Sequence, residues 1–374
     1  MIRYSTFGPY IDRDDIKTVS NAIQLKNWYK KPYYYCEKLE KEFSKFHKRK
    51  FALLTPNCTS AIHLFLHSLN LKSNDEVIAP ECTWIASVSP VYQTKAKLIL
   101  SDVDRQNFCI SVEDIKKKIT KNTKVIISVN LYGNMANYRE LEKICKKKKI
   151  HLLEDAAESL GSTYYKKKSG SFGSASVFSF HRTKTMTTGE GGILLLDNKK
   201  IYNRCKMLRD HGRGENTKDL FNEEFSFKYM PSNMQAALGY SQFKKLPLLL
   251  KKKREIFENY KYYLKEIEEK IYLNEDNKIV KNGLWAVIIV LKNYDSIIVN
   301  KIFNLLKKKN YFPRPLFYPI SLLPAYKKKN KKLGKKNINA HETYKGGLVL
   351  PSSYLLKKID IKKICDLIKS AIRE

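Results

Sequence analysis

The chain has 374 residues, 43% of them hydrophobic, and its 71 Lys and Arg against 37 Asp and Glu give a formal net charge of +34. This length and apolar content predict a globular protein with two domains, or one large domain and a smaller lobe. No apolar run reaches membrane-spanning length and the first residues lack the apolar core of a secretory signal, so we expect a cytoplasmic protein with no membrane partner.

The basic excess suggests two hypotheses. Clustered Lys and Arg can neutralise phosphates, so a polyanion-binding protein is one of them. The basic runs recur throughout the chain, however, and none of them lies in a DNA- or RNA-binding motif. We therefore expect lysine-rich solvated faces and no nucleic-acid partner. A positive field that favours capture of an anionic small substrate remains a weaker hypothesis.

The seven cysteines are odd in number and form no CxxC pair. In a long chain this pattern favours reduced thiols over a disulfide framework or a zinc site, so we expect no metal.

The first half of the chain, after an irregular arm, alternates short apolar strands with helical patterns. Strands are expected at 51–54, 76–80, 97–101, 124–129 and 150–153, and helices at 33–47, 59–66, 83–88, 112–119 and 138–145. Alternation of this kind predicts βα units and a mainly parallel sheet. Functional side chains should then collect at the carboxyl ends of the strands.

The expected helix at 59–66 begins with Thr59 and Ser60. Free N–H groups and the helix dipole at such an end favour a phosphate, and two hydroxyls add donors. The alternative is that Thr59 only caps the helix.

Two strand ends carry further candidates. Trp84, close to the end of the strand at 76–80, either stacks on a flat cofactor ring or belongs to the core. Asp155 follows the strand at 150–153 and either holds a cationic ring nitrogen or forms a capping pair with Glu158 for the next helix.

Residues 178–192 are the candidate reactive centre. A strand that ends near Phe180 delivers Ser179, His181 and Lys184 onto a polar turn, and the glycines at 189, 191 and 192 permit a tight return into the strand at 193–196. Lys184 is flanked by small hydroxyl residues, and a lysine in such a pocket can lose its proton and form a Schiff base. The alternative is an ordinary solvated surface lysine.

The remainder predicts a helix at 201–208, a polar loop at 209–213 and a helix with small residues around 234–239. A long charged helix at 246–271 should bridge to a second lobe with a strand at 284–291 and helices at 297–309 and 359–372, while 327–336 is expected to be an exposed loop. We therefore expect a large domain at 1–250 and a small α/β domain at 251–374.

Four motifs resemble, in order, those of the DegT/DnrJ/EryC1/StrS sugar aminotransferases, which are pyridoxal phosphate enzymes of fold type I. The similarity extends over nearly the whole chain. The motifs are Asn57-Cys58-Thr59-Ser60-Ala61, Glu154-Asp155-Ala156-Ala157-Glu158, Ser179 to Lys184 with Gly189-Glu190-Gly191-Gly192, and Ser232 to Ala237.

The resemblance assigns expected roles at the cofactor. Lys184 would hold pyridoxal phosphate covalently and shuttle protons, and Asp155 would keep the pyridine nitrogen protonated. Glu158 would approach the ring hydroxyl and Trp84 would stack on the ring. The phosphate would be bound by Thr59, Ser60 and Ser179, with Cys58 in the same loop where the family usually has glycine.

The resemblance also assigns expected contacts to substrate and partner. The family usually dimerises with shared active sites, and Lys228 would reach the phosphate of the neighbouring subunit where Asn is common. His181, Arg314 and Tyr318 are candidates for substrate contacts. Ser321 stands where many members have His, so a substrate contact should differ.

The implied reaction is amino transfer from glutamate to a 4-keto-6-deoxy nucleotide sugar. The stretch at 314–324 is most similar to the branch of the family that converts GDP-4-keto-6-deoxymannose to GDP-perosamine. A UDP- or dTDP-linked keto sugar is the alternative substrate. Family dehydratases carry His at the lysine position, so Lys184 argues against dehydration.

Overall fold

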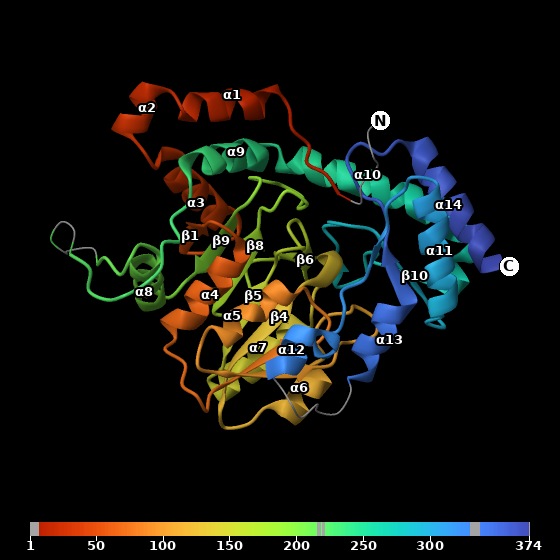
Figure 1. Cartoon of the computed structure of the whole chain (residues 1–374), viewed down its shortest axis with the longest axis horizontal. Coiled ribbons are helices and arrows are strands. Elements are labelled where there is room, and N and C mark those ends of the chain that lie inside the picture. Colours follow the sequence, from red (N-terminus) through yellow and green to blue (C-terminus); the bar gives the residue numbers. More distant parts are fainter. Residues whose placement is uncertain (1–6, 215–217, 219–220, 330–336, 374) are drawn as a thin grey trace.

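The computed structural model describes residues 7–214, 218, 221–329 and 337–373. A seven-stranded sheet lies at the centre of the molecule (Figure 1), and all neighbours in it are parallel except β9, which is antiparallel to both β1 and β8. Its order is β1 (Phe51–Thr55), β9 (Gly192–Leu196), β8 (Ala175–Ser179), β5 (His151–Asp155), β4 (Thr123–Val129), β2 (Glu76–Pro80) and β3 (Lys97–Ser101). The mainly parallel sheet expected from the sequence is confirmed.

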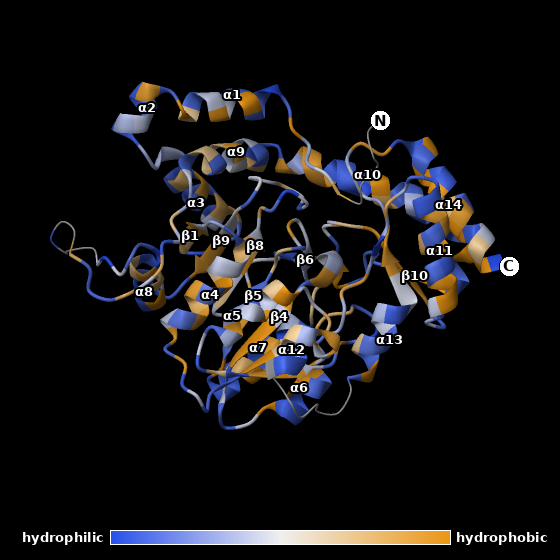
Figure 2. Cartoon of the chain, in the orientation of Figure 1, coloured by the Kyte–Doolittle hydropathy of each residue, from blue (hydrophilic) through white to orange (hydrophobic). Residues whose placement is uncertain are grey.

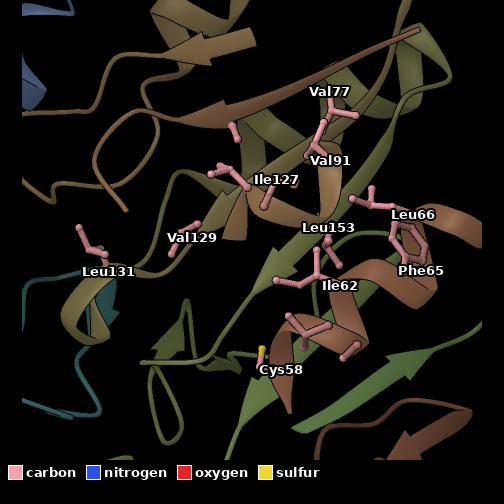
Figure 3. Packing of buried hydrophobic residues seen from close by; sticks show 14 of the residues in the cluster. Cys58, Ile62, Phe65, Leu66, Val77, Val91, Ile127, Val129, Leu131 and Leu153 are labelled. Carbon is pink, nitrogen blue, oxygen red and sulfur yellow. The ribbon is translucent and has the colours of Figure 1, made fainter. Parts of the chain in front are cut away.

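Helices cover the central sheet, which explains why its strands are nearly continuous apolar runs. In Figure 3, Ile62, Phe65 and Leu66 of α4 pack towards Leu153 of β5 in one of the buried clusters. The helices of this part are α3 (Tyr34–Phe46), α4 (Cys58–Ser68), α5 (Ser89–Tyr92), α6 (Val112–Lys118), α7 (Tyr138–Lys148), α8 (Lys199–Arg209) and α9 (Asn233–Lys244), with the short turns η1 (Ile85–Ser87) and η2 (Leu131–Gly133).

A smaller antiparallel sheet forms the second sheet of the molecule, in the order β10 (Ile271–Leu273), β12 (Ile288–Leu291), β14 (Gly347–Val349) and β13 (Arg314–Pro315). The helices α10 (Leu246–Leu264), α11 (Ser296–Lys308) and α14 (Lys358–Arg373) enclose a separate apolar cluster with it. Figure 2 shows hydrophilic and hydrophobic residues alternating on α11 and α14, as expected for helices with one buried face. The domain boundary at residue 250 stays a prediction.

The remaining elements connect these two parts. They are η3 (Lys265–Lys270), η4 (Ile320–Leu322), α12 (Pro324–Lys329), α13 (Ile338–Gly346) and a three-stranded sheet of β11 (Val280–Lys281), β6 (Thr163–Tyr164) and β7 (Lys167–Lys168). Because β11 pairs with β6, a strand from the second half of the chain completes a sheet begun in the first half.

Several expected elements differ from those observed. The N-terminal arm is not irregular, because it forms α1 (Arg13–Ala22) and α2 (Leu25–Lys30), and α1 lies alongside α9 (Figure 1). A capping box between Asp12 and Asp15 begins α1. The helix expected at 246–271 ends at Leu264, and the strand expected from 284 begins at Ile288. Residues 327–329 lie in α12, and the rest of the loop expected at 327–336 lies outside the described residues.

Within these described ranges, no helix is both long enough and apolar enough to cross a membrane. All seven cysteines are buried and free.

Candidate active site

A cavity of about 340 Å³ opens where the carboxyl ends of the central strands face β13 and β14. A parallel sheet collects ligands at this edge, and the volume suits a small molecule. The lining includes Asn57, Cys58, Thr59, Trp84, Ser87, Asp155, Glu158, Ser179, His181, Lys184, Trp285, Arg314 and Phe317.

A larger hollow of about 1050 Å³ lies beside α8, where Arg204 and Arg213 are among the lining residues. We place the chemistry in the smaller cavity, because there an amine and two buried carboxylates converge.

Lys184 lies in the turn after β8, where its backbone N–H donates to the carbonyl of His181 over 2.8 Å. Its Nζ donates to Oε1 of Glu158 over 3.1 Å and lies 4.0 Å from the centre of the Trp285 ring. Only 15% of the side chain is exposed. The alternative of a solvated surface lysine is therefore wrong.

Two buried carboxylates line the cavity at the end of β5: Asp155 is its last residue, and Glu158 follows three residues later. Ser87 Oγ donates to Oδ2 of Asp155 over 2.7 Å, and the N–H of Tyr132 donates to Oε2 of Glu158 over 3.0 Å. Burial raises the pKa of both carboxyl groups, and the nearby Lys184 opposes the rise. A cationic ligand atom beside Asp155 would favour its ionised form further.

The alternative in which Asp155 and Glu158 cap the next helix is wrong. Residues 156–162 form turns and no helix, and Oδ1 of Asp155 accepts from the N–H of Ala157 over 3.1 Å.

The start of α4 also lines the cavity. Asn57 is the cap, because its Oδ1 accepts from the N–H of Ser60 over 2.8 Å. The alternative that Thr59 caps this helix is therefore wrong. Ser60 also donates its hydroxyl to Asn57 Oδ1 over 3.0 Å, whereas Thr59 is among the lining residues. Burial, followed by the charge of Asp155, raises the pKa of Cys58 well above its usual value.

Gly192 explains how β9 reaches this helix start. A Cβ atom built on it would lie 2.5 Å from the backbone carbonyl carbon of Asn57 and 2.5 Å from the backbone nitrogen of Cys58. Only a glycine allows this approach. Gly189 has a φ of +82° in the turn between Lys184 and β9.

Aromatic rings form the walls of the cavity. Trp84 is 60% exposed, so the alternative that it belongs to the core is wrong, and its ring lies 5.9 Å from that of Phe317. Trp285, by contrast, is buried, stacks on Phe7 at 4.5 Å, and donates its indole N–H to the carbonyl of Thr183 over 2.8 Å.

The three candidates for substrate contacts occupy different places. His181 and Arg314 line the cavity, where Nδ1 of His181 lies 2.8 Å from the Thr183 hydroxyl. Burial lowers the pKa of His181. The ring of Tyr318 instead packs against that of Tyr344, with centroids 4.5 Å apart.

Lys228 and Ser321 are not among the residues that line the cavity, and each contacts residues outside it. Lys228 is half exposed, and its Nζ donates to Oδ1 of Asp210 over 2.6 Å. Ser321 contacts Glu81 and His341.

Asn57, Ser87 and Trp285 are among the cavity residues to which sequence reasoning gave no role. Asn57 could have been found, because Asn directly before a helical pattern is a preferred cap. Nothing in the sequence near Ser87 or Trp285 marks either of them, because their roles depend on contacts across the fold.

These residues fit a flat cofactor that carries a carbonyl, a ring nitrogen and a phosphate. Lys184 offers an amine for the carbonyl, Asp155 a buried carboxylate for a cationic nitrogen, and the start of α4 N–H groups for a phosphate. Trp84 offers a ring face at the edge of the same cavity.

Comparison with known proteins identifies relatives over nearly the whole chain. Residues 9–369 match the DegT/DnrJ/EryC1/StrS aminotransferase family. A GDP-perosamine synthase from Vibrio cholerae is 30% identical over 97% of this chain and 98% of its own length. A GDP-perosamine synthase from Escherichia coli O157:H7 is 33% identical over 94% of this chain and 93% of its own length.

Solved structures show the same fold. Helicobacter pylori PseC, an aminotransferase involved in the biosynthesis of pseudoaminic acid, matches with a TM-score of 0.91 at 24% identity and covers all of both chains. The pyridoxal phosphate form of the sugar aminotransferase Spr1654 from Streptococcus pneumoniae matches with a TM-score of 0.90 at 24% identity over 98% of each chain.

Proposed function

Because the chain belongs to the DegT/DnrJ/EryC1/StrS aminotransferase family, we propose that it transfers an amino group from glutamate to GDP-4-keto-6-deoxymannose and forms GDP-perosamine. It is an enzyme of the nucleotide-sugar aminotransferase kind, and its cofactor is pyridoxal phosphate. The convergence of Lys184, Asp155 and the start of α4 in one cavity carries the proposal. The choice of GDP and of the sugar rests on two relatives that are GDP-perosamine synthases.

Pyridoxal phosphate, when bound, supplies an electron sink for the carbon next to the transferred nitrogen. Lys184 would hold the cofactor through Nζ, the atom at which this residue would also accept and return a proton. Asp155 would hold a protonated ring nitrogen, and the Ser87 hydroxyl, which donates to it over 2.7 Å, supports the charged carboxylate. Glu158, 3.1 Å from Lys184 Nζ, would orient the amine and contact the ring hydroxyl.

We assign the phosphate to the start of α4 and to Ser179, with Cys58 in the same loop. Thr59 and Ser179 line the cavity and are better placed than Ser60, whose N–H and hydroxyl both bond Asn57.

For the substrate side, we assign contacts to His181 and Arg314, which line the cavity. Trp84, 60% exposed, has a free ring face for the cofactor ring. Tyr318 lies farther along the same segment, against Tyr344.

We infer that the enzyme is a cytoplasmic homodimer in which Lys228 reaches the cofactor phosphate of the neighbouring subunit. Lys228 is half exposed and is not among the residues that line the cavity of its own chain. Large apolar side chains are exposed on the N-terminal helices, among them Trp28 and Tyr29, and Phe225 is exposed close to Lys228 in sequence. Apolar surface of this kind suits a subunit interface.

The covalent role of Lys184 is tested by reduction with borohydride in the presence of pyridoxal phosphate, followed by peptide mapping. The label should appear on Lys184 alone. Label on another lysine would overturn the assignment, and Lys184→Ala is the control that should take up none.

The substrate is tested with a panel of GDP-, UDP- and dTDP-linked keto sugars, each supplied with glutamate. The proposal expects the highest kcat/KM for GDP-4-keto-6-deoxymannose. Preference for a UDP- or dTDP-linked sugar would select the alternative substrate. A dehydratase relative, GDP-4-keto-6-deoxy-D-mannose 3-dehydratase from Escherichia coli O55:H7, is 28% identical, and loss of a sugar hydroxyl without amine transfer would favour that reaction.

A further inference from the structure

A buried polar cluster lies next to the cavity but does not line it. It consists of Glu81, Ser321, Asn337 and His341, and we call it the Glu81 cluster. Glu81 is 2% exposed and directly follows β2. Its Oε1 accepts from the Ser321 hydroxyl and lies 3.1 Å from Nε2 of His341, while its Oε2 accepts from the Asn337 amide. One carboxylate therefore joins two separate segments to the end of β2: the turn η4 with Ser321, and helix α13 with its cap Asn337.

Backbone contacts reinforce the same junction. The N–H of Ile320 donates to the carbonyl of Glu81 over 2.9 Å, and Cys82 forms an isolated β-bridge with Pro319. Cys82 also donates its thiol to the carbonyl of Phe317 over 3.5 Å. The segment at 317–321 is thus held directly against residues 81–82.

The two segments joined by the cluster form one wall of the cavity. Thr83 and Trp84 follow Glu81 by two and three residues, and Arg314 and Phe317 precede Ser321 in the other segment. The Trp84 and Phe317 rings face each other across this junction at 5.9 Å. A change in how Glu81 holds Ser321 would therefore shift the rings that line the cavity.

Each member of the cluster has a defined partner. Nζ of Lys118 donates to Oδ1 of Asn337 over 2.8 Å, which leaves the amide nitrogen for Glu81. Nε2 of His341, on α13, lies 3.3 Å from the Ser321 hydroxyl. An imidazole from α13 thus lies beside Ser321. Without Glu81, the Ser321 hydroxyl, the Asn337 amide and the His341 ring would each lose one hydrogen-bond partner, which is costly where the group is buried.

We propose that the Glu81 cluster positions the side of this wall formed by Arg314 and Phe317, and so sets the affinity for the nucleotide sugar. Its members are positioning residues, since they act through the wall and not on the reacting atoms. The inference rests on the proposed function only for the identity of the ligand that meets this wall.

The first test is hydrogen–deuterium exchange, which needs no substrate. Glu81→Ala should raise exchange in two peptides, one over residues 81–87 and one over 314–323, relative to the unchanged protein. Asp360→Ala is the matched control, because Asp360 is also a buried carboxylate but bonds Tyr311 and the N–H of Lys357 in the other core. It should leave both peptides unchanged. Unchanged exchange in Glu81→Ala would overturn the proposal.

The second test separates the two half-reactions. Glu81→Ala should raise KM for the nucleotide sugar about tenfold, because small displacements of binding groups have effects of this order or larger. The spectral change of the bound cofactor with glutamate alone should stay within about twofold. Glu81→Gln keeps one carbonyl acceptor and should recover most of the affinity. Equal losses in both half-reactions would indicate a general defect and overturn the proposal.

If Glu81→Ala does not fold, Ser321→Ala takes its place. Ser321→Ala removes only one hydrogen-bond donor to Glu81, and that donor is at a partly buried position. It should raise the same KM by a smaller factor and raise exchange at 314–323. No change in either measurement would overturn the proposal. If the enzyme transfers no amine at all, the proposed function fails, while the exchange results still decide whether the cluster holds the wall.

Discussion

Asp155 is the residue whose surroundings say most about the chemistry. Its carboxylate is buried, accepts a hydrogen bond from Ser87, and has a pKa raised by burial. In such a site a permanent charge needs a partner, and a protonated ring nitrogen supplies one. In the proposed function, this carboxylate and Lys184, in the turn after β8, would form the electrostatic frame of the cofactor site.

Replacement of Asp155 by Asn tests this frame. The amide is nearly isosteric but cannot balance a ring cation, so kcat should fall by about 10²- to 10³-fold, as for loss of other preorganised electrostatic groups. Cofactor should still become attached to Lys184. Steady-state kinetics with glutamate and the nucleotide sugar provide the measurement, and a kcat within about threefold of the unchanged enzyme would contradict this role.

At this scale the sequence located residues that converge on the cavity, because the motifs mark Lys184, Asp155 and Thr59 and all three line it. It left open whether Thr59 contributes to a phosphate site or caps α4, because both roles place a hydroxyl residue at a helix start; in the structure the cap is Asn57. Ser87 and Trp285 could not be predicted, since each reaches the site from an element distant in sequence.

The approach of β9 to α4 is the element-scale feature that shapes the proposed phosphate site. Gly192→Ala would place a methyl group 2.5 Å from backbone atoms of Asn57 and Cys58. The start of α4 should shift, with a loss of about 1–3 kcal/mol in the free energy of unfolding and weaker cofactor binding. Denaturation and cofactor titration measure the two effects.

Gly239→Ala is the matched control. Its Cβ would meet flexible side-chain ends of Thr188 and Leu39 at 2.7 and 2.8 Å, away from α4. It should lower stability with little change in cofactor affinity. Equal losses of affinity in both variants would contradict a specific role for Gly192.

Helix α10 carries a buried amine whose protonation opposes folding. Lys253 is 2% exposed, donates to the carbonyl of Ser352 over 2.7 Å, and burial lowers its pKa to about 7. The unfolded chain, with a pKa near 10.4, binds more protons between these two values, so this group makes stability rise with pH there. The rise is absent below about pH 7, where both states are protonated.

Lys253→Met removes this dependence. The quantity to compare is the free energy of unfolding of the unchanged protein minus that of Lys253→Met. This difference should rise by up to about 1.4 kcal/mol per pH unit from pH 7 towards pH 10. Urea denaturation at several pH values measures it. Parallel stability curves for the two proteins would contradict a depressed pKa at Lys253.

Elements whose buried residues follow a regular spacing along the sequence were predictable. Strands β2 and β3, for example, begin and end where expected. The helices of the N-terminal arm were not predictable, because α1 depends on packing against α9 and on the ion pair between Asp15 and Lys245. The end of α10 was also missed, since charged residues continue the helical pattern into η3.

At the scale of the whole molecule, a homodimer with shared sites predicts recovery of activity in mixed subunits. Lys184→Ala and Lys228→Ala should each be impaired alone. Refolded together, they should regain about a quarter of full activity, because half of the dimers are mixed and each mixed dimer has one intact site.

Mixing Lys184→Ala with Asp155→Asn is the control, because both residues line the cavity of one chain. No intact site forms in that mixture, so no recovery is expected. Equal results from both mixtures would contradict a role for Lys228 in the neighbouring subunit.

The fold and family were predictable at this scale, because the alternation of βα units and the order of the motifs can both be read directly from the sequence. The net charge of +34 needs no further function to explain it, because lysines are spread over exposed faces and several pair with carboxylates, as Lys362 does with Asp366 at 2.9 Å.

The central claim is amino transfer to a nucleotide-linked keto sugar, and isotope tracing tests it most directly. The enzyme is incubated with pyridoxal phosphate, ¹⁵N-glutamate and GDP-4-keto-6-deoxymannose, and the products are analysed by mass spectrometry. We predict a ¹⁵N-labelled GDP-amino sugar and an equal amount of 2-oxoglutarate, both abolished in Lys184→Ala. A sugar that has lost a hydroxyl and carries no ¹⁵N would contradict the claim.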